Sequence, residues 1–220
     1  MGVYRDVVAS HGTAEQAAWL DEALGKLESP PKAMTLRIAL ARAARKLPES
    51  TVAEVDVELP SGPDYARWSL RDHARTALVL AALERQSEHE QVVLYSELLL
   101  RAEIGEQVSM LRMIPVLPAP ERFVDAVIDV CRTNSIPVFE SIACGNPYPA
   151  ACFPEHNYNQ LVMKAIFSGL DTRRIVGLAE RVNAELVRMT SDCGDERRAA
   201  GRPVPDDIDH IAKLYQARTG

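Results

Sequence analysis

The stretch SLRDHARTALVLAALERQSEHEQVVLYSELLLRA, residues 69–102, decides the fold class of this chain. Ser69 is a residue type that caps helices, and alanine, leucine and valine then recur to about residue 85. A second run of the same kind extends from about residue 88 to residue 102. These residue types favour packed helices over strands. We therefore predict two core helices in this stretch.

The composition extends this prediction to all 220 residues. The chain contains 29 alanines and 22 leucines against only 12 aromatic residues, which is the usage of packed helices rather than sheets. Hydrophobic residues make up 47% and charged residues 25%, which excludes disordered and fibrous classes. We predict an all-α fold of about nine antiparallel helices, stacked either as an α-solenoid of the HEAT or armadillo kind or as an irregular bundle.

Local signals place helices on both sides of the quoted stretch. Thr13 and Gln16 form a capping box that opens a helix over 13–27, and another helix is expected over 34–47. The segment 49–67 is expected to be a connecting loop. Three prolines mark a possible internal boundary near 115–120 within a single domain spanning 1–220. Helices are predicted after it over 121–133, 137–144, 154–167, 173–192 and 207–218.

Charge and cysteine usage restrict the class of partner. Residues 1–110 carry 12 basic against 17 acidic side chains and residues 111–220 carry 13 against 14, so neither half has the positive surface that nucleic acid requires. The longest strictly apolar run, 77–83, is too short to cross a bilayer, and no secretory signal is evident, which predicts a cytoplasmic protein. The four cysteines match no common zinc spacing, and we predict neither a metal nor another cofactor.

The second half carries the polar motifs, including all five asparagines. They are RTNS (132–135), NPYP (146–149), FPEHNYNQ (153–160), RVN (181–183) and DERRAAGR (195–202). Amide and guanidinium groups recognise carboxylate, phosphate or backbone groups through paired hydrogen bonds. We predict a ligand-binding cluster made of Arg132, Asn134, Glu140, Asn146, Tyr148, Glu155, Asn159, Lys164, Arg181, Asn183, Arg197 and Arg202.

Simpler interpretations stay open beside this one. The asparagines and prolines can serve as helix caps and turns, and Arg181, Glu185, Arg188 and Asp192 can form an exposed salt-bridge ladder. A catalytic alternative takes Glu155 or Glu196 as general base, with His156 or Lys164 as acid or electrostatic stabiliser and Arg132 or Arg197 as an anion clamp. A metal site of Glu155, His156, Asp192 and Glu196 is less favoured. If the binding hypothesis holds, the cluster residues should converge on one pocket.

The same motifs resemble those of a known family. NPYPAACFPEHNYNQLVMKAIFSGL, followed by RVNAEL and ERRAAGRPVP, is similar to the EboA family of bacterial proteins. The resemblance implies a helical cytoplasmic protein from an operon that also encodes a prenyltransferase-like membrane protein and enzyme-like partners, a system associated with secondary-metabolite traffic. It carries over no catalytic activity. We therefore predict a non-catalytic binding or adaptor protein whose partner is a polar small molecule or a protein of the same operon; the alternative is a small-molecule-modifying enzyme.

Overall fold

The computed structural model describes residues 1–27, 33–52 and 58–219, and within them the fold is all-α, as predicted. The part so described contains thirteen α-helices, four short 3-10 helices and no strand. The α-helices are α1 (Gly2–His11), α2 (Ala14–Gly25), α3 (Ala33–Lys46), α4 (Leu70–Leu83), α5 (Glu88–Arg101), α6 (Ile104–Met113), α7 (Val124–Val130), α8 (Ile136–Ala143), α9 (Tyr148–Cys152), α10 (Glu155–Phe167), α11 (Leu178–Arg181), α12 (Ala184–Ala199) and α13 (Asp206–Thr219). The 3-10 helices are η1 (Tyr65–Arg67), η2 (Ile114–Val116), η3 (Pro120–Phe123) and η4 (Thr172–Arg174).

Side-chain caps set where the N-terminal helices begin. Thr13 and Gln16 form the predicted capping box of α2, and Ser69 forms one with Asp72 at the start of α4. Ser87 does the same with Glu90 for α5. Each box satisfies backbone N–H groups that have no partner inside the helix. The sequence therefore located these three helix starts to within a residue.

Several expected boundaries were wrong. The helix expected over 173–192 is instead η4, α11 and α12, because Gly177 takes a left-handed φ of 75° and Asn183 caps a new helix. The helix expected over 121–133 begins as 3-10 turn η3, and α1 and α9 were not predicted. The break and the two unpredicted helices raise the number of α-helices from about nine to thirteen in the described ranges. The loop expected over 49–67 includes residues 53–57, which lie outside the described residues.

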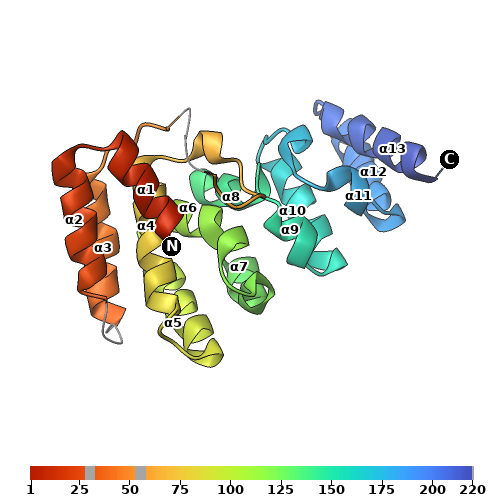
Figure 1. Cartoon of the computed structure of the whole chain (residues 1–220). Helices are drawn as coiled ribbons and strands as arrows, with labels where there is room; N and C mark the ends of the chain where they lie inside the picture. The colour runs from red at the N-terminus through yellow and green to blue at the C-terminus, as the bar shows by residue number, and fades with distance from the viewer. Residues whose placement is uncertain (28–32, 53–57, 220) are drawn as a thin grey trace.

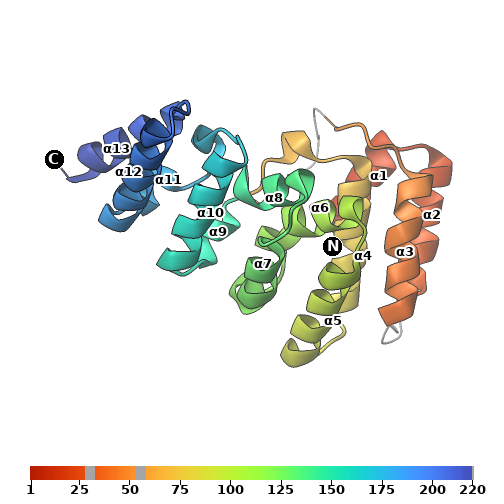
Figure 2. The same ribbon diagram turned by 180° about the vertical axis from the view of Figure 1, so that it is seen from behind.

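The helices form an elongated row, closer to the solenoid-like alternative than to a closed bundle (Figures 1 and 2). Along the row α3 packs on α4, α4 on α6, α6 on α8, α8 on α10 and α10 on α12. The helices α2 and α3 lie at one end and α12 and α13 at the other. Each helix of this row packs on neighbours in the row that are often not the next helix along the chain.

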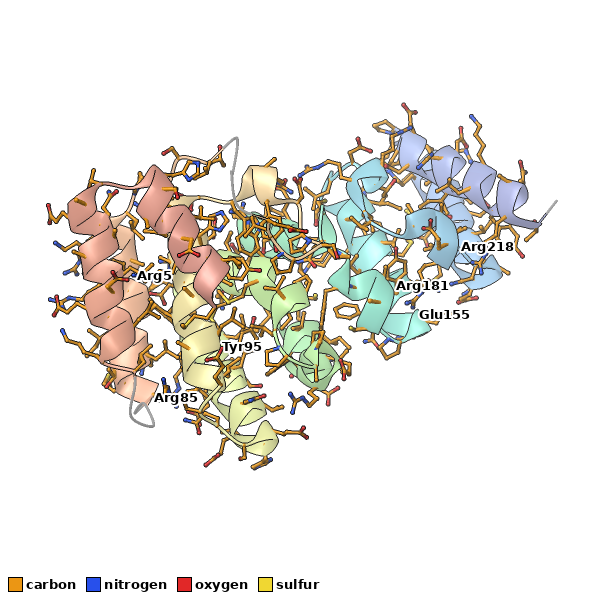
Figure 3. All side chains as sticks on the ribbon, in the orientation of Figure 1. Arg5, Arg85, Tyr95, Glu155, Arg181 and Arg218 are labelled. Carbon is orange, nitrogen blue, oxygen red and sulfur yellow. The ribbon has the colours of Figure 1, made fainter. Side chains whose placement is uncertain are left out.

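The core runs along the row without interruption, and buried residues from Tyr4 to Ile211 belong to one cluster. The quoted stretch supplies its centre, since α4 is buried nearly all round. Farther along, α10 buries one face, made of Tyr158, Leu161, Val162 and Ala165. Side chains fill the space between successive helices, for example Tyr95, whose hydroxyl donates to the Met110 carbonyl at 2.6 Å (Figure 3). No helix in the described ranges combines the length and the apolar character needed to span a bilayer.

Candidate functional site

The largest of the cavities found among the described residues lies between α3, α4, α6 and α8 and has a volume of about 730 Å³. This size falls within the range of small-molecule sites, roughly 300–1,000 Å³. We call it the arginine cavity because five arginines from α3, η1, α4 and α6 line it. Its charged lining consists of Arg45, Arg67, Arg71, Arg75, Arg112, Glu49, Asp72, Glu103, Glu106 and Glu140.

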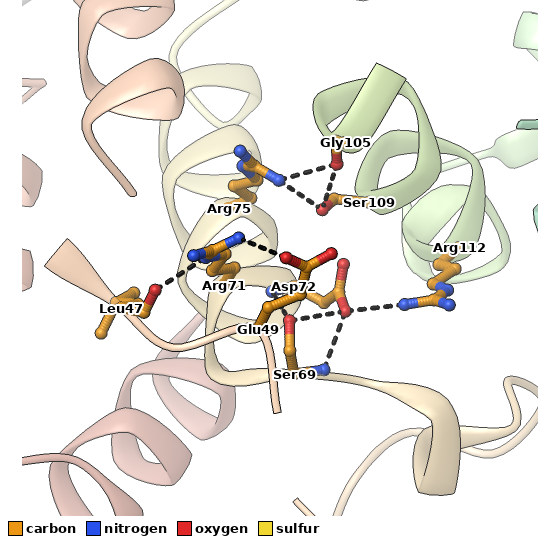
Figure 4. Close-up of polar contacts among 9 residues, drawn as sticks. All are labelled: Leu47, Glu49, Ser69, Arg71, Asp72, Arg75, Gly105, Ser109 and Arg112. Atoms are coloured by element: carbon orange, nitrogen blue, oxygen red, sulfur yellow. Dashed lines mark hydrogen bonds and ion pairs between the residues drawn. The ribbon is translucent and has the colours of Figure 1, made fainter. Parts of the chain in front are cut away.

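Asp72 lines the arginine cavity, and its carboxylate is held by neighbouring donors (Figure 4). Its Oδ2 atom accepts hydrogen bonds from the Ser69 backbone N–H at 2.8 Å and the Ser69 hydroxyl at 2.9 Å. The same oxygen accepts from Arg112 Nη1 at 2.9 Å, while the Asp72 side chain is only 4% exposed. A carboxylate held by three donors has little freedom to move. Asp72 thereby joins the start of α4 to α6 and orients Arg112.

Arg75 is the unusual residue of the cavity. It is 4% exposed, and its Nη1 donates to the Gly105 carbonyl at 2.7 Å and the Ser109 hydroxyl at 2.8 Å. Its Nε donates to the Leu40 carbonyl at 3.3 Å, so one guanidinium links α3, α4 and α6. Burial lowers the pKa of Arg75. None of the carboxylates of the described residues lies within ion-pair distance of this buried charge.

Two further arginines of the cavity lining form ion pairs. Arg71 donates to the Leu47 carbonyl at 2.7 Å and pairs with Glu49, which is itself largely exposed. Arg67 pairs with Glu140 at 2.9 Å across the cavity mouth. Glu140 also accepts from Arg174 at 2.5 Å, and the hydrogen bond from Arg174, opposed by burial and helped by the charges of both arginines, lowers the pKa of Glu140. Of the arginines 67, 71, 75 and 112, Arg75 is the one that forms no ion pair with a described carboxylate, although Glu106 and Asp72 act on its charge from a longer distance.

The predicted C-terminal cluster does not converge on one pocket. Several of its members instead donate to backbone carbonyls at helix ends. Lys164 donates to the carbonyls of Cys131 at 2.6 Å and Thr133 at 2.5 Å, where α7 ends. Arg181 donates to the carbonyls of Ala150 at 2.5 Å and Phe153 at 2.8 Å, where α9 ends (Figure 3). These contacts are those of caps that hold neighbouring helices together.

The amides of the cluster are also used internally. Asn146 is buried and donates to the carbonyls of Leu111 at 2.8 Å and Ser141 at 3.2 Å. Asn159 and Asn183 exchange a reciprocal pair of hydrogen bonds at 3.2 and 3.0 Å. Asn183 in addition accepts from the Leu186 N–H as the cap of α12. The hydroxyl of the buried Tyr148 donates to the Pro120 carbonyl at 2.9 Å.

The other predicted residues lie apart on the surface. Asn134, Glu155, His156, Glu196 and Arg202 are exposed and line none of the five cavities found in the described residues. Arg197 donates to the Pro203 carbonyl at 2.7 Å. The ladder interpretation is confirmed for Glu185, Arg188 and Asp192, which form exposed ion pairs on α12, but not for Arg181.

Three cavities do contain predicted residues, and Asn146 lines the smallest of them, together with Asp64 and Arg67. Glu140 lines the arginine cavity, and Arg132 and Lys164 share a second cavity of about 350 Å³. The proposed metal set does not form, because no group of three or more His, Cys, Asp or Glu side chains in the described ranges is placed to hold an ion. The five arginines of the cavity, 45, 67, 71, 75 and 112, were not predicted. For Arg71 and Arg75 the signal was their i, i+4 spacing inside the apolar run 69–85.

The fold and its cavities define an all-helical protein with preformed, ligand-sized clefts and charged side chains inside the largest one. The family model described as "Metabolite traffic protein EboA" matches residues 2–213, which is nearly the whole chain. The chain therefore belongs to the EboA family. Searches of curated proteins and of solved structures each gave no significant match.

Proposed function

We propose that this chain is a non-catalytic binding protein of a metabolite-traffic system, and that it holds a polar metabolite by an anionic group in the arginine cavity. The observation that carries the proposal is Arg75, a buried guanidinium that lines the cavity and has no carboxylate partner among the described residues. Taking a charge out of water costs several kcal/mol, and an anion beside it would recover part of that cost. The family description supports a role with metabolites.

The surroundings of Arg75 favour holding an anion. Its Nη2 atom makes no hydrogen bond with a described residue, so this nitrogen can still donate. Arg45 lines the same cavity from α3 and has no ion pair with a described carboxylate. Guanidinium groups recognise carboxylates and phosphates through two parallel hydrogen bonds. A metabolite with either group would be bound between α3 and α4.

The lining favours binding over chemistry. The described residues around the cavity include no His, Cys, Lys or Tyr, which are common bases and nucleophiles. Its serine hydroxyls are engaged: Ser109 donates to the Gly105 carbonyl, and Ser141 to the Val138 carbonyl. The carboxylates Asp72 and Glu140 are held by arginines. The hydroxyl of Ser69 donates to the carboxylate of Asp72, but this pair is the capping box of α4, and Arg112 holds the same carboxylate oxygen.

Co-purification tests the proposal directly. The protein is purified from its host, and small molecules released by denaturation are quantified by mass spectrometry for the wild type, Arg45→Gln and Arg75→Gln. The matched control is Arg42→Gln, on the same helix but lining a different groove, with Trp19 and Ile38. We expect one anionic molecule near stoichiometric amounts in the wild type and the control, and much less in the two cavity variants. Equal retention in all four proteins would reject the site.

A second assay addresses the catalytic alternative. The purified protein is incubated with an extract of its host, and the metabolites are compared before and after. We expect an unchanged extract. Turnover that is lost in Glu155→Gln or Glu196→Gln would reject the non-catalytic proposal, because either substitution removes the proposed base while leaving the arginine cavity intact.

A further inference from the structure

The second cavity lies between α7, α8 and α10 and has a composition unlike that of the arginine cavity. We call it the phenylalanine cavity because three of the four phenylalanines in the chain line it: Phe139, Phe153 and Phe167. The rest of its apolar lining is Ile128, Cys131, Leu161 and Met163, and its polar lining is Arg132, Asn157, Gln160 and Lys164. A mainly apolar and aromatic lining with few polar groups is typical of small-molecule sites.

Three of its four polar residues lie on one helix. Asn157, Gln160 and Lys164 are spaced three and four residues apart on α10, so they share a helix face. Asn157 and Gln160 make no side-chain hydrogen bond with a described residue. Their amide groups are therefore available to a ligand along this helix face.

Lys164 supplies the charge of the cavity. Its ammonium group donates two hydrogen bonds to carbonyls where α7 ends and lies 4.8 Å from the centroid of the Phe139 ring. An ammonium group has three protons, so one remains available. No carboxylate of a described residue lies within ion-pair distance of it. The nearby Arg132 is exposed at the rim and pairs with Asp129 at 3.1 Å.

One aromatic ring of the apolar lining is largely exposed to solvent. Phe167, the last residue of α10, leaves 65% of its surface exposed although it lines the cavity. Covering such a ring with an apolar group is favourable, and aromatic partners add an edge or stacking contact. Burial raises the pKa of the Cys131 thiol to about 12, so the thiol belongs to the apolar lining and does not act as a nucleophile.

We propose that the phenylalanine cavity binds a small aromatic carboxylate, with its ring among Phe139, Phe153 and Phe167 and its carboxylate at Lys164. A volume of about 350 Å³ is at the lower end of ligand sites, which suits one or two rings. The site is separate from the arginine cavity: the two share no lining residue, and α8 contributes Glu140 to one and Phe139 to the other. The proposal does not depend on the function proposed above.

The probe is 2-naphthoate, titrated by calorimetry against the full-length chain. We expect saturable binding, weakened roughly 10- to 100-fold in Lys164→Met, because a hydrogen bond to a charged group is lost. Lys164→Arg restores the charge and should bind within a few-fold of the wild type. Phe167→Ala should weaken binding by roughly 3- to 10-fold, whereas Val176→Ala, at an exposed residue outside the cavity, should leave it unchanged.

Other arms of the same experiment separate the possible failures. The neutral analogue 2-naphthalenemethanol should bind as weakly as naphthoate binds Lys164→Met, and decanoate should bind more weakly than naphthoate. Arg75→Gln should leave naphthoate binding unchanged, which keeps this site distinct from the arginine cavity. Each of four results would overturn the proposal. The wild type could fail to bind naphthoate at millimolar concentration, or naphthoate could bind equally well to a Lys164→Met protein with native circular dichroism. The alcohol could bind as well as naphthoate, or decanoate could bind better.

Discussion

Replacing Arg181 by methionine tests whether a motif residue that looks ligand-binding holds two helices together. Arg181, at the end of α11, donates to two carbonyls where α9 ends and lies 4.6 Å from the centroid of the Tyr158 ring. A hydrogen bond to a charged group contributes roughly 1.5–3 kcal/mol and a cation–π contact roughly 0.5–1 kcal/mol. Methionine keeps an apolar stem against the ring, and Arg181 is half-buried, so we expect a loss of about 3 kcal/mol in the free energy of unfolding.

The assay is urea unfolding followed by circular dichroism, with the midpoint lowered and the slope unchanged. The matched control is Arg188→Met on the neighbouring helix α12, where the guanidinium pairs with Glu185 and Asp192 in the open. Exposed pairs of this kind contribute little, so the control should unfold like the wild type. A loss under about 1 kcal/mol for Arg181→Met would refute the capping role and return this residue to the ligand-binding hypothesis.

Three further experiments probe the same row of helices. Gly177→Ala should lower the free energy of unfolding by roughly 2–4 kcal/mol, because φ is 75° and the new Cβ atom would lie 2.5 Å from the Cβ atom of Ala150. The control is Gly169→Ala, where φ is 72° but the space around the Cβ position is open, and it should lower the same quantity by about 1 kcal/mol. Asn159→Ala and Asn183→Ala should be non-additive by roughly 1–2 kcal/mol in a double-mutant cycle, and additive losses would contradict the amide pair. Burial lowers the pKa of His73 to about 4, below its ordinary value near 6.5. As the pH falls, the unfolded chain therefore protonates this histidine before the folded chain does. The free energy of unfolding should decrease as the pH drops from about 6.5 to 4. His73→Phe should flatten that part of the pH–stability curve, and an unchanged slope would contradict the burial.

Local signals predicted much of the fold because short-range chemistry determines it. The capping boxes at Thr13 and Ser69 and the apolar periodicity of α10 involve residues three or four apart, which a sequence displays directly. The predicted helix over 173–192 failed because its apolar period continued through two breaks. Asn183 followed by Ala184 and Glu185 is itself a capping signal, and Gly177 marks a left-handed turn, so both breaks were legible in the sequence.

The arginine cavity could not be predicted in the same way. Its pairs join residues far apart in the chain: Arg67 and Glu140 are 73 positions apart, and Asp72 and Arg112 are 40. Composition does not separate a buried arginine from one on a solvated helix face, since both are the same residue in a sequence. What distinguishes Arg75 is the packing of α3, α4 and α6 around it, which exists only in the folded chain.

An open row of short helices explains why several polar motif residues, Arg181 among them, hold helix ends instead of lining a cavity. Each helix leaves carbonyl groups without partners at its end, and in a row these ends face the next helix, away from water. Long donors such as Lys164 and Arg181 satisfy them from the neighbouring helix. Specific polar motifs are therefore needed to hold α7, α9 and α10 in register, whatever the protein binds. Lys164 does both, because the ammonium that caps α7 also lines the phenylalanine cavity, and this makes it the residue where the capping and binding interpretations can be tested together.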